Sequence, residues 1–398
     1  MRFLNLFSKE SGKTDYFTRM LRMYGLFKTL GLNEEQEKWL SINDNELKLY
    51  KTTAELSIII NRFASMFSNG IFVVKDYKTE EIIENHELLK LLEKPNAFQN
   101  RNEFLKDIAI NMCVYGNSII KENRGSALKE FPSTLFPLPT SEVKIKQKKF
   151  NYWEATEKAD IIEKYILDNW NTSFEPNEVI HLRHHNPEDI VVGLSPLHAL
   201  QMPITNIRGS YGYRNVNIMK KGANGLISPK TDPTGIIPLE GDDRLEIEKQ
   251  FKDTHGIFDN QSPIKFAKMP VDYTSISLPI KDSMLFEEVT EDTKRIIDAF
   301  GLNQNIFIQS TFNNVIEGLR MSYQDGIIPF AELVCFGLND SLDLFNKGIY
   351  VELTYDHLPV FKEDEMLKAN ATKTKAEAME KLVNLGYTID EAKIVVGL

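Results

Sequence analysis

Two long helical patterns flank a proline-rich insert in the second half of the chain, and this arrangement strongly limits the fold. Ser195-Pro196 is a typical helix start, because serine caps a first turn and proline lacks only an N–H that the turn leaves unbonded. The first pattern extends to Lys221, with Pro203 as the candidate kink. The second pattern covers about residues 281–300. Between them, the sequence predicts a short helix near 242–254 and a strand around 271–279.

The first half of the chain alternates between helical and strand patterns. Apolar residues at spacings of three and four predict a helix over Glu46–Ser68. The turn at Gly116-Asn117 separates a helix at 101–115 from a strand at 118–120. Further predicted segments are a strand at 71–74, a helix at 86–93 ended by Pro95, a break at 136–139, and strands at 143–146 and 179–182. We therefore expect an α+β, helix-rich fold in which helices pack on small sheets.

The C-terminal part of the chain is mainly helical in pattern. A polar stretch rich in Asn and Gln covers 301–314, and a long helical pattern runs from Asn314 to about Leu344, interrupted by Gly326 and Pro329. A strand is predicted at 350–353. From residue 362 onward the pattern is helical again, with a capping-box start at Thr388-Ile389-Asp390-Glu391.

Charge and composition narrow the classes of function. The 398 residues include 57 acidic and 47 basic side chains, which gives a net charge of −10, and 42% of the residues are apolar. The apolar fraction suffices for a sizeable core or for two or three modules. A protein that grips nucleic acid by its phosphates needs a basic surface, so the acidic balance disfavours that class.

Neither a membrane anchor nor a cysteine framework is expected. The longest apolar runs fall far short of the roughly twenty residues that span a bilayer. The apolar start of the chain is followed at once by Lys9 and Glu10, so it is too short for a signal peptide. Cys113 and Cys335 lie far apart in apolar contexts and are predicted to be buried free thiols.

Two motifs that suggest catalysis lack required elements. Gly12-Lys13-Thr14 has Phe7 where a phosphate-binding loop needs its first glycine, and no apolar strand precedes it. Gly193-Leu194-Ser195-Pro196-Leu197 resembles a nucleophile elbow for three positions. However, Leu197 replaces the second glycine, and Pro196 has no N–H to offer an oxyanion hole. A helix N-cap is the favoured interpretation of Ser195.

A histidine cluster and an acidic helix face are the remaining candidates. His181, His184 and His185 have spacings conceivable for metal ligands, but a polar strand end is the favoured interpretation. A hydrolase using Ser195 and a metal enzyme using these histidines stay open as enzymatic alternatives. In the 281–300 pattern, one face carries Asp282, Glu287, Glu288, Glu291 and Asp292, and a solvated surface explains that face as readily as a functional one.

Several short motifs occur in a characteristic order from about residue 48 to the end. They are His86–Asn96, Phe98–Phe104, Tyr115-Gly116-Asn117, Pro137-Leu138-Pro139, Glu178–Leu182, Gly193–Leu197, Ile296–Leu302, Thr311–Asn314 and Ile328-Pro329-Phe330. In this order the chain resembles the HK97-type portal proteins of tailed phages. It departs from the family at Leu302-Asn303-Gln304, where relatives often carry Val-Pro-Pro, and residues 1–47 show no match.

The resemblance implies the portal fold, in which wing, stem, clip and crown assemble with other copies into a ring. The implied division is an N-terminal arm at 1–47, a first wing part at 48–194, a stem helix at 195–221, a clip at 222–281, a second stem helix at 282–300, a tunnel loop at 301–314, a second wing part at 315–361 (kinked long helix and strand), and C-terminal crown helices at 362–398.

The resemblance also implies a role without catalysis, cofactor or metal. Family members form rings, typically of twelve subunits, at one capsid vertex of the virion, and the genome is packaged and ejected through the ring. The implied partners are further copies of the chain, double-stranded DNA that passes through non-specifically, the terminase large subunit, major capsid and scaffolding proteins, and a head–tail adaptor, with assembly in the host cytoplasm and no membrane involved. Another head–tail connector or a minor capsid protein is the alternative.

Two sets of side chains then become candidates for the channel wall. The tunnel-loop set is Gln309, Ser310, Thr311, Phe312, Asn313 and Asn314. The acidic stem set is Glu287, Glu288, Glu291 and Asp292. Neutral amides make contacts without sequence information, and acidic groups repel phosphates. A wall of this kind is expected to let a polyanion pass without holding it.

Overall fold

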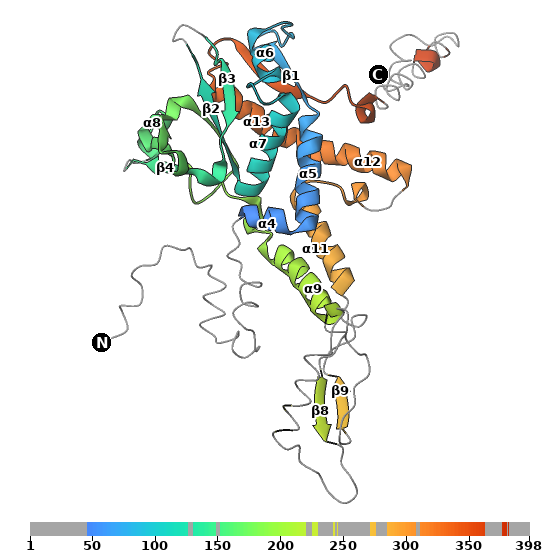
Figure 1. Ribbon diagram of the computed structural model, residues 1–398. Coiled ribbons are helices and arrows are strands. Elements are labelled where there is room, and N and C mark those ends of the chain that lie inside the picture. The colour runs from blue at the N-terminus through green and yellow to red at the C-terminus, as the bar shows by residue number, and fades with distance from the viewer. Residues whose placement is uncertain are drawn as a thin grey trace, which may run out of the picture. The chain divides into compact units, whose positions relative to one another are not determined.

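The computed structural model describes residues 46–125, 130–148, 152–219, 225–229, 242, 245, 271–275, 285–307, 311–362, 376–379 and 381. The chain divides into two compact units (Figure 1). The first unit combines residues 1–56 with 199–296, and the second combines 57–198 with 297–398. Each unit therefore draws on segments that lie far apart in the sequence.

The first unit contains helices and one antiparallel strand pair among its described residues. Its elements are α4 (Glu46–Thr52), α9 (Gln201–Met219), β8 (Gly225–Pro229), β9 (Val271–Ser275) and most of α11 (Leu285–Ala299). Strand β8 pairs with β9 from Gly225 opposite Ser275 to Pro229 opposite Val271. The predicted strand around 271–279 is thus confirmed for 271–275, whereas the helix predicted near 242–254 lies largely outside the described residues.

The helix predicted from Ser195 to Lys221 is wrong at its start. Residues Pro196–His198 form the single 3-10 turn η5, and α9 begins only at Gln201. Pro203 is the third residue of α9 and does not interrupt the helix. The N–H groups of the first turn have no partner within a helix, so a proline there costs no intrahelical hydrogen bond. Lys220 and Lys221 lie outside the described residues.

The second unit contains three small antiparallel sheets in its described part. The first pairs β1 (Ile71–Asp76) with β10 (Ile349–Thr354), the second has the order β3 (Thr134–Pro137), β2 (Asn117–Asn123), β7 (Val179–Arg183), and the third has the order β4 (Val143–Gln147), β5 (Ile162–Leu167), β6 (Thr172–Phe174). The predicted break at 136–139 is therefore wrong for Phe136 and Pro137. A proline is tolerated there because β3 is an edge strand.

The second unit also contains helices, several of which pack on these sheets, and this confirms the α+β class. They are α5 (Ala54–Ser68, its first turn in the first unit), α6 (Glu87–Glu93), α7 (Arg101–Tyr115), α8 (Lys158–Ile161), α12 (Phe312–Ser322) and α13 (Ile328–Ser341). The single helix predicted over 46–68 is split at Thr53, which separates α4 from α5. None of the described helices combines the length and apolarity that a membrane span requires.

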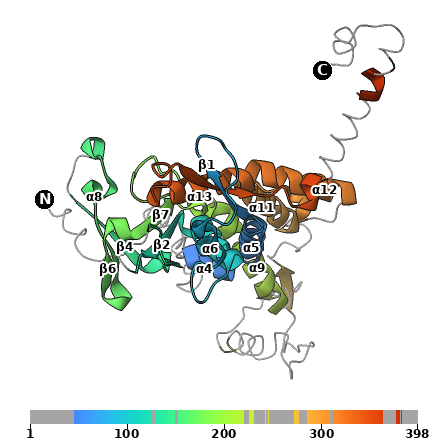
Figure 2. The same ribbon diagram turned by 90° about the horizontal axis from the view of Figure 1, so that it is seen from above.

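The core of the second unit lies where α5 meets α13. The ring of Phe330 on α13 packs edge-to-face on Phe63 and Phe67 of α5, at centroid distances of 5.1 and 4.9 Å. Helix α13 also packs on β7 and β10 (Figure 2). The buried side chain of Asn339 accepts from the N–H of Val351 at 2.8 Å and donates to its carbonyl at 3.0 Å. Both backbone groups of Val351 on β10 are thereby hydrogen-bonded.

A long interrupted helical run spans the second unit. Helix α12 continues through the π-helical turn η7 (Tyr323–Ile327) into α13, so the predicted interruption near Gly326 is confirmed. A Cβ atom on Gly326 would lie 2.7 Å from the carbonyl oxygen of Gly301, which itself has φ of +66°. Only glycine allows this close approach of two backbones, and the wider π-turn makes room for it.

Candidate channel-lining surfaces

The acidic face of α11 is smaller than the sequence predicts. Glu287, Glu288 and Glu291 are exposed, but Asp292 is only 4% exposed. The Nη1 of Arg295, one turn further along α11, donates to Asp292 Oδ1 at 3.2 Å. Of the four residues in the predicted acidic stem set, only Glu287, Glu288 and Glu291 are therefore exposed.

The acidic side of α11 borders a groove within the first unit. The groove has a volume of about 810 Å³, and α9 contributes uncharged residues such as Thr205, Asn206 and Ser210 to its lining. On the α11 side, Lys294 Nζ donates to Glu291 at 2.5 Å, and this contact lowers the pKa of the glutamate. The carboxylate of Glu291 is thus ionised at neutral pH, and the groove combines negative charge with small polar groups.

The tunnel-loop candidates start a helix instead of forming a loop. Phe312, Asn313 and Asn314 make up the first turn of α12, so their assignment to a loop is corrected. Thr311 has extended backbone angles, and its carbonyl accepts from the N–H of Val315 at 3.0 Å, which makes it the cap that begins the helix. All three helical residues are exposed. Gln309 and Ser310 lie outside the described residues.

The segment between α11 and α12 is fixed at its start. The N–H of Asn303 donates to Ser322 Oγ at 2.8 Å, and that hydroxyl donates to the carbonyl of Gly318 at 2.7 Å. The Nε2 of Gln304 contacts both carboxylate oxygens of Asp298 at 3.1 Å. The 3-10 turn η6 (Gln304–Ile306) is therefore attached both to the end of α11 and to α12.

Ser195 has a structural role. It is buried, its Oγ donates to the carbonyl of Val114 at 2.6 Å, and it accepts from the N–H of Leu197 at 3.2 Å. These bonds hold η5 against the end of α7. Because the hydroxyl is engaged by backbone groups, its contacts give no support to the hydrolase alternative.

The histidines do not converge on a metal site. Tyr165 and Asn117 bond the two ring nitrogens of His181, with Nδ1 3.2 Å from the Tyr165 hydroxyl and Nε2 3.0 Å from Asn117 Oδ1. Desolvation, and then the charges of nearby cations, lower the pKa of His181 to about 3. Burial also lowers the pKa of His184. Among the described residues, no three His, Cys, Asp or Glu side chains are grouped to hold a metal ion.

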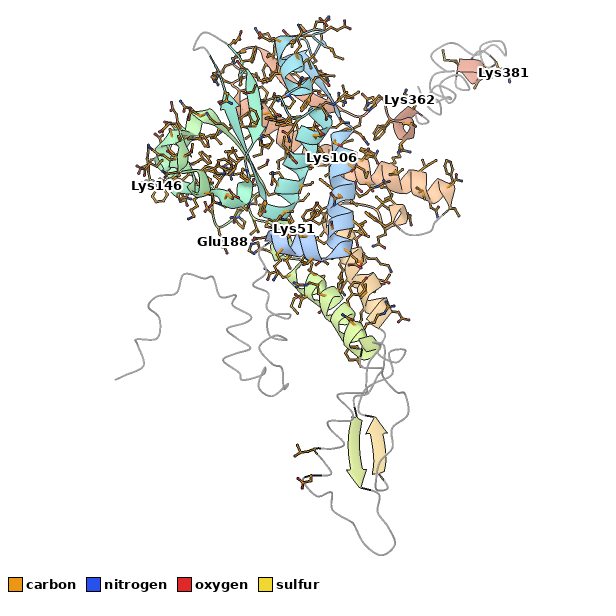
Figure 3. All side chains as sticks on the ribbon, viewed as in Figure 1. Lys51, Lys106, Lys146, Glu188, Lys362 and Lys381 are labelled. Carbon is orange, nitrogen blue, oxygen red and sulfur yellow. The ribbon has the colours of Figure 1, made fainter. Side chains whose placement is uncertain are left out.

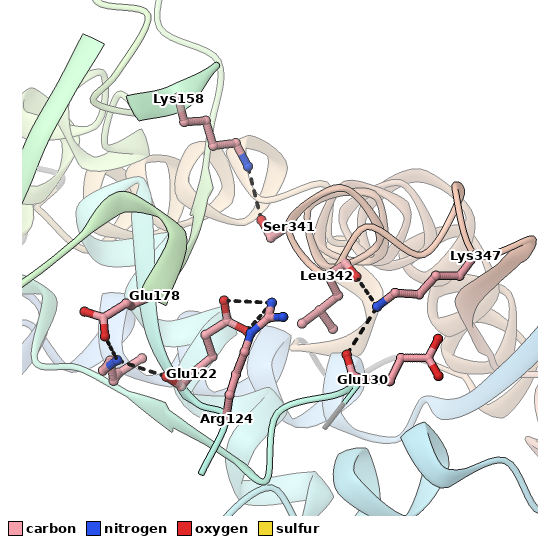
Figure 4. A network of polar contacts seen from close by, with 9 residues as sticks. Glu122, Arg124, Glu130, Lys158, Glu178, Ser341, Leu342 and Lys347 are labelled. Atoms are coloured by element: carbon pink, nitrogen blue, oxygen red, sulfur yellow. Dashed lines mark hydrogen bonds and ion pairs between the residues drawn. The ribbon is translucent and has the colours of Figure 1, made fainter. Parts of the chain in front are cut away.

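Figure 4 shows polar contacts at β2 and in the segment that follows α13. Arg124 lies 3.3 Å from the buried carboxylate of Glu122, and burial raises the pKa of that carboxyl. Lys121 lies 3.3 Å from Glu178, before β7. The Nζ of Lys347 donates to the carbonyl of Leu342 at 3.1 Å. Sequence reasoning missed these contacts, because their residues are scattered along the chain and no spacing connects them.

Basic side chains are spread over separate elements of the second unit. Lys106 lies on α7, Lys146 on β4 and Lys362 beyond β10, and all three are exposed (Figure 3). Lys146 also pairs with Glu163 on β5 at 2.8 Å. A dispersed set of lysines agrees with the acidic overall balance and differs from the basic surface of a DNA-gripping protein.

Comparison with known sequences identifies related proteins. The sequence profile of the phage portal protein family matches residues 54–397. The portal protein of Enterobacteria phage HK97 is 24% identical over 220 residues, which cover 54% of this chain and 48% of that protein. An uncharacterized protein of Rickettsia bellii (strain RML369-C) is 22% identical over 346 residues, which cover 85% of each chain.

Solved structures share the fold. A chain from the neck of an empty GTA particle, computed with C6 symmetry, has a TM-score of 0.57 at 17% identity, over 89% of this chain and 94% of that chain. An HK97 family phage portal protein from Corynebacterium diphtheriae has a TM-score of 0.57 at 12% identity, over 79% and 97%. Since the family profile covers most of its length, the chain belongs to the phage portal protein family.

Proposed function

We propose that this chain assembles with further copies of itself into a ring, which forms the DNA channel at one vertex of a capsid. The observation that carries the proposal is the match to the phage portal family over residues 54–397. Family membership also supports a virion-associated location. The chain acts as a conduit and docking platform and catalyses no reaction, while a separate terminase drives the DNA.

The proposed ring contains twelve copies. A chain from the neck of a native GTA particle, computed with C12 symmetry, has the same fold at a TM-score of 0.55. In this ring α9 and α11 belong to the stem, β8 and β9 to the clip, and most of the second unit to the wing. Residues 1–47 form the arm, 301–314 the tunnel segment and 362–398 the crown. A closed ring needs a head-to-tail contact between two different surfaces of each copy.

The chemistry of the candidate wall supports a conduit. Exposed Glu287, Glu288 and Glu291 repeat around the ring and repel phosphates, so DNA gains little from releasing its counterions there. Asn313 and Asn314 offer neutral amides that bond phosphates weakly and without reading sequence. The ring proposed here also docks the terminase large subunit, the major capsid and scaffolding proteins, and a head–tail adaptor.

Capsids that assemble without this chain are expected to contain no packaged DNA, because no channel connects their interior with the packaging motor. The measurement is nuclease-protected DNA per particle, with and without the chain supplied in trans. Capsids that fill normally in its absence would contradict the proposal. Filled capsids without tails would instead point to a head–tail connector.

Replacing Asn313 and Asn314 by lysine is expected to slow packaging on the order of tenfold at low salt, because two added cations per copy turn a weakly binding surface into a phosphate-binding one. The replacement of both residues by glutamine is the matched control, since it keeps the amides. The readout is the rate at which DNA becomes nuclease-protected, at two salt concentrations. Equal packaging rates for the lysine and glutamine variants would contradict the proposal that Asn313 and Asn314 line the channel.

A further inference from the structure

Helix α12 carries an apolar stripe that the described residues of the second unit leave open. The stripe consists of Phe312, Val315, Ile316 and Leu319, whose spacings of three and four place them on one face. Phe312 is 76% exposed and the other three side chains are only half-buried. Among the described elements, α12 packs mainly on η6 and on the π-turn η7, and it projects from the other helices of its unit (Figure 1).

The stripe is an extension of the core. The next position on the same face is Tyr323, which is 4% exposed. Its ring packs on Tyr355 and Phe361 at centroid distances of 5.3 and 5.7 Å. Moving from Tyr323 back toward Phe312, the same face passes from full burial to nearly full exposure. A face that is built like a core and left uncovered is typical of a surface that a partner covers.

An aromatic cluster lies at the other end of the same helical run. It consists of Phe336, Phe345, Tyr77 and Tyr350. The ring of Phe345 lies 6.2 Å from Phe336 and 5.7 Å from Tyr77, which lies 6.5 Å from Tyr350. Phe336 is 65% exposed and Tyr77 is 57% exposed. Adjoining aromatic side chains of this exposure are the usual anchors of protein interfaces.

The two surfaces lie too far apart to cover each other within one copy. Phe312 and Phe336 belong to one run of α12, η7 and α13, and a helix rises about 1.5 Å per residue, which separates them by on the order of 35 Å along a straight axis. A head-to-tail ring requires two different, mutually complementary surfaces on each copy. The stripe and the aromatic cluster are two different exposed apolar surfaces on each copy.

We infer that the α12 stripe of one copy packs against the aromatic cluster of the next copy in the ring. This inference rests on the proposed function and specifies its subunit contact. Phe312 is the anchor, because its exposed ring can enter the cluster in edge-to-face contact with Phe336, Phe345 or Tyr77. The half-buried aliphatic residues of the stripe surround this anchor and exclude water.

Two single variants and their mixture test the contact. Phe312→Asp disables the stripe and Phe336→Asp disables the cluster, so each variant alone is expected to be a monomer by native mass spectrometry. In an equimolar mixture, the intact stripe of the second variant can still bind the intact cluster of the first. The mixture is therefore expected to form a one-to-one dimer and nothing larger.

Phe98→Asp is the matched control, because Phe98 is 85% exposed, lies in the same unit and gains the same charge. It is expected to assemble as the wild type does. Aspartate in the first turn suits the helix dipole, so circular dichroism is expected to find α12 intact in Phe312→Asp.

The possible failures are distinguishable. A wild-type monomer would contradict the ring itself, and with it the proposed function. A wild-type ring that both variants also form would contradict only this contact. Either variant dimerising alone, or a mixture that stays monomeric, would also overturn the pairing of stripe with cluster while leaving the ring in place.

Discussion

Replacing Gly116 by alanine is expected to lower the free energy of unfolding by about 3–5 kcal/mol, which is enough to prevent stable folding in many proteins. Gly116 ends α7 with φ of +71°, where an L-residue costs about 1–2 kcal/mol. A Cβ atom there would lie 2.3 Å from the carbonyl oxygen of Leu194 and 2.7 Å from the N of Ser195. These are backbone atoms, so no side chain can turn aside to relieve the clash.

The neighbouring contacts prevent an easy backbone shift. The carbonyl of Gly116 accepts from the N–H of His184 at 2.8 Å. Asn117 binds Gly193 from both sides, accepting from its N–H at 2.7 Å and donating to its carbonyl at 2.9 Å. Moving the chain to admit a methyl group would therefore break buried hydrogen bonds as well.

Gly348→Ala is the control for this prediction. Gly348 has φ of +75°, but a Cβ atom there would meet nothing within 4 Å. It is expected to lose only about 1 kcal/mol, from the left-handed backbone alone. Chemical denaturation of both variants measures the two losses. Equal losses of unfolding free energy in the two variants would show that the clash with the Leu194 backbone does not contribute to the destabilisation.

Acidification from pH 6.5 to pH 4 is expected to remove up to about 3 kcal/mol of stability through His181. The pKa of His181 is about 3 in the folded chain, below the ordinary value of 6.5. In this window the unfolded chain binds a proton at His181 that the folded chain does not. The contribution of His181 is therefore complete above pH 6.5 and is lost as the pH falls toward 3.

Burial makes the neutral form of His181 the favoured one in the folded chain. Asn117 Oδ1 accepts from Nε2, and the Tyr165 hydroxyl can donate to Nδ1, so both ring nitrogens of the neutral imidazole are satisfied. The charges of Arg183 and Lys158 also disfavour a positive charge on the ring. These charges thus act in the same direction as burial.

His181→Gln separates this effect from the titration of carboxyl groups. The difference in unfolding free energy between wild type and this variant is expected to shrink by up to about 3 kcal/mol between pH 6.5 and pH 4. His357→Gln, at an exposed position, is the matched variant measured in the same way. A level difference for His181→Gln would contradict the neutral assignment.

Local patterns predicted many elements of the fold. The positions of glycine and proline and the spacing of apolar residues were the signals. They predicted the Gly116-Asn117 turn, the paired strand segments and the interruption at Gly326. The contact between Gly116 and Gly193 could not be predicted, because two backbones that touch leave no side-chain pattern. The capping box of Asn100 and Glu103 was missed, although its Asn-x-x-Glu spacing is a visible signal.

The candidate surfaces were predicted only in part. Helical spacing placed Glu287, Glu288 and Glu291 on one exposed face, but it could not foresee that Asp292 turns toward the groove and Arg295. The amide-rich composition of 301–314 suggested a loop, whereas Thr311 caps a helix that starts two residues before the predicted one. The exposed stripe of α12 was not predicted, because Phe312 was assigned to the tunnel loop and sequence alone does not distinguish a covered apolar face from an open one.

The central claim is that many copies close around a hole through which DNA passes. The most direct test is electron microscopy of the purified chain, combined with the mass of the assembly. The account predicts a ring with the mass of twelve copies and a central opening wide enough to admit a DNA duplex. Isolated subunits at high concentration, or a ring whose opening stays narrower than the duplex, would contradict it.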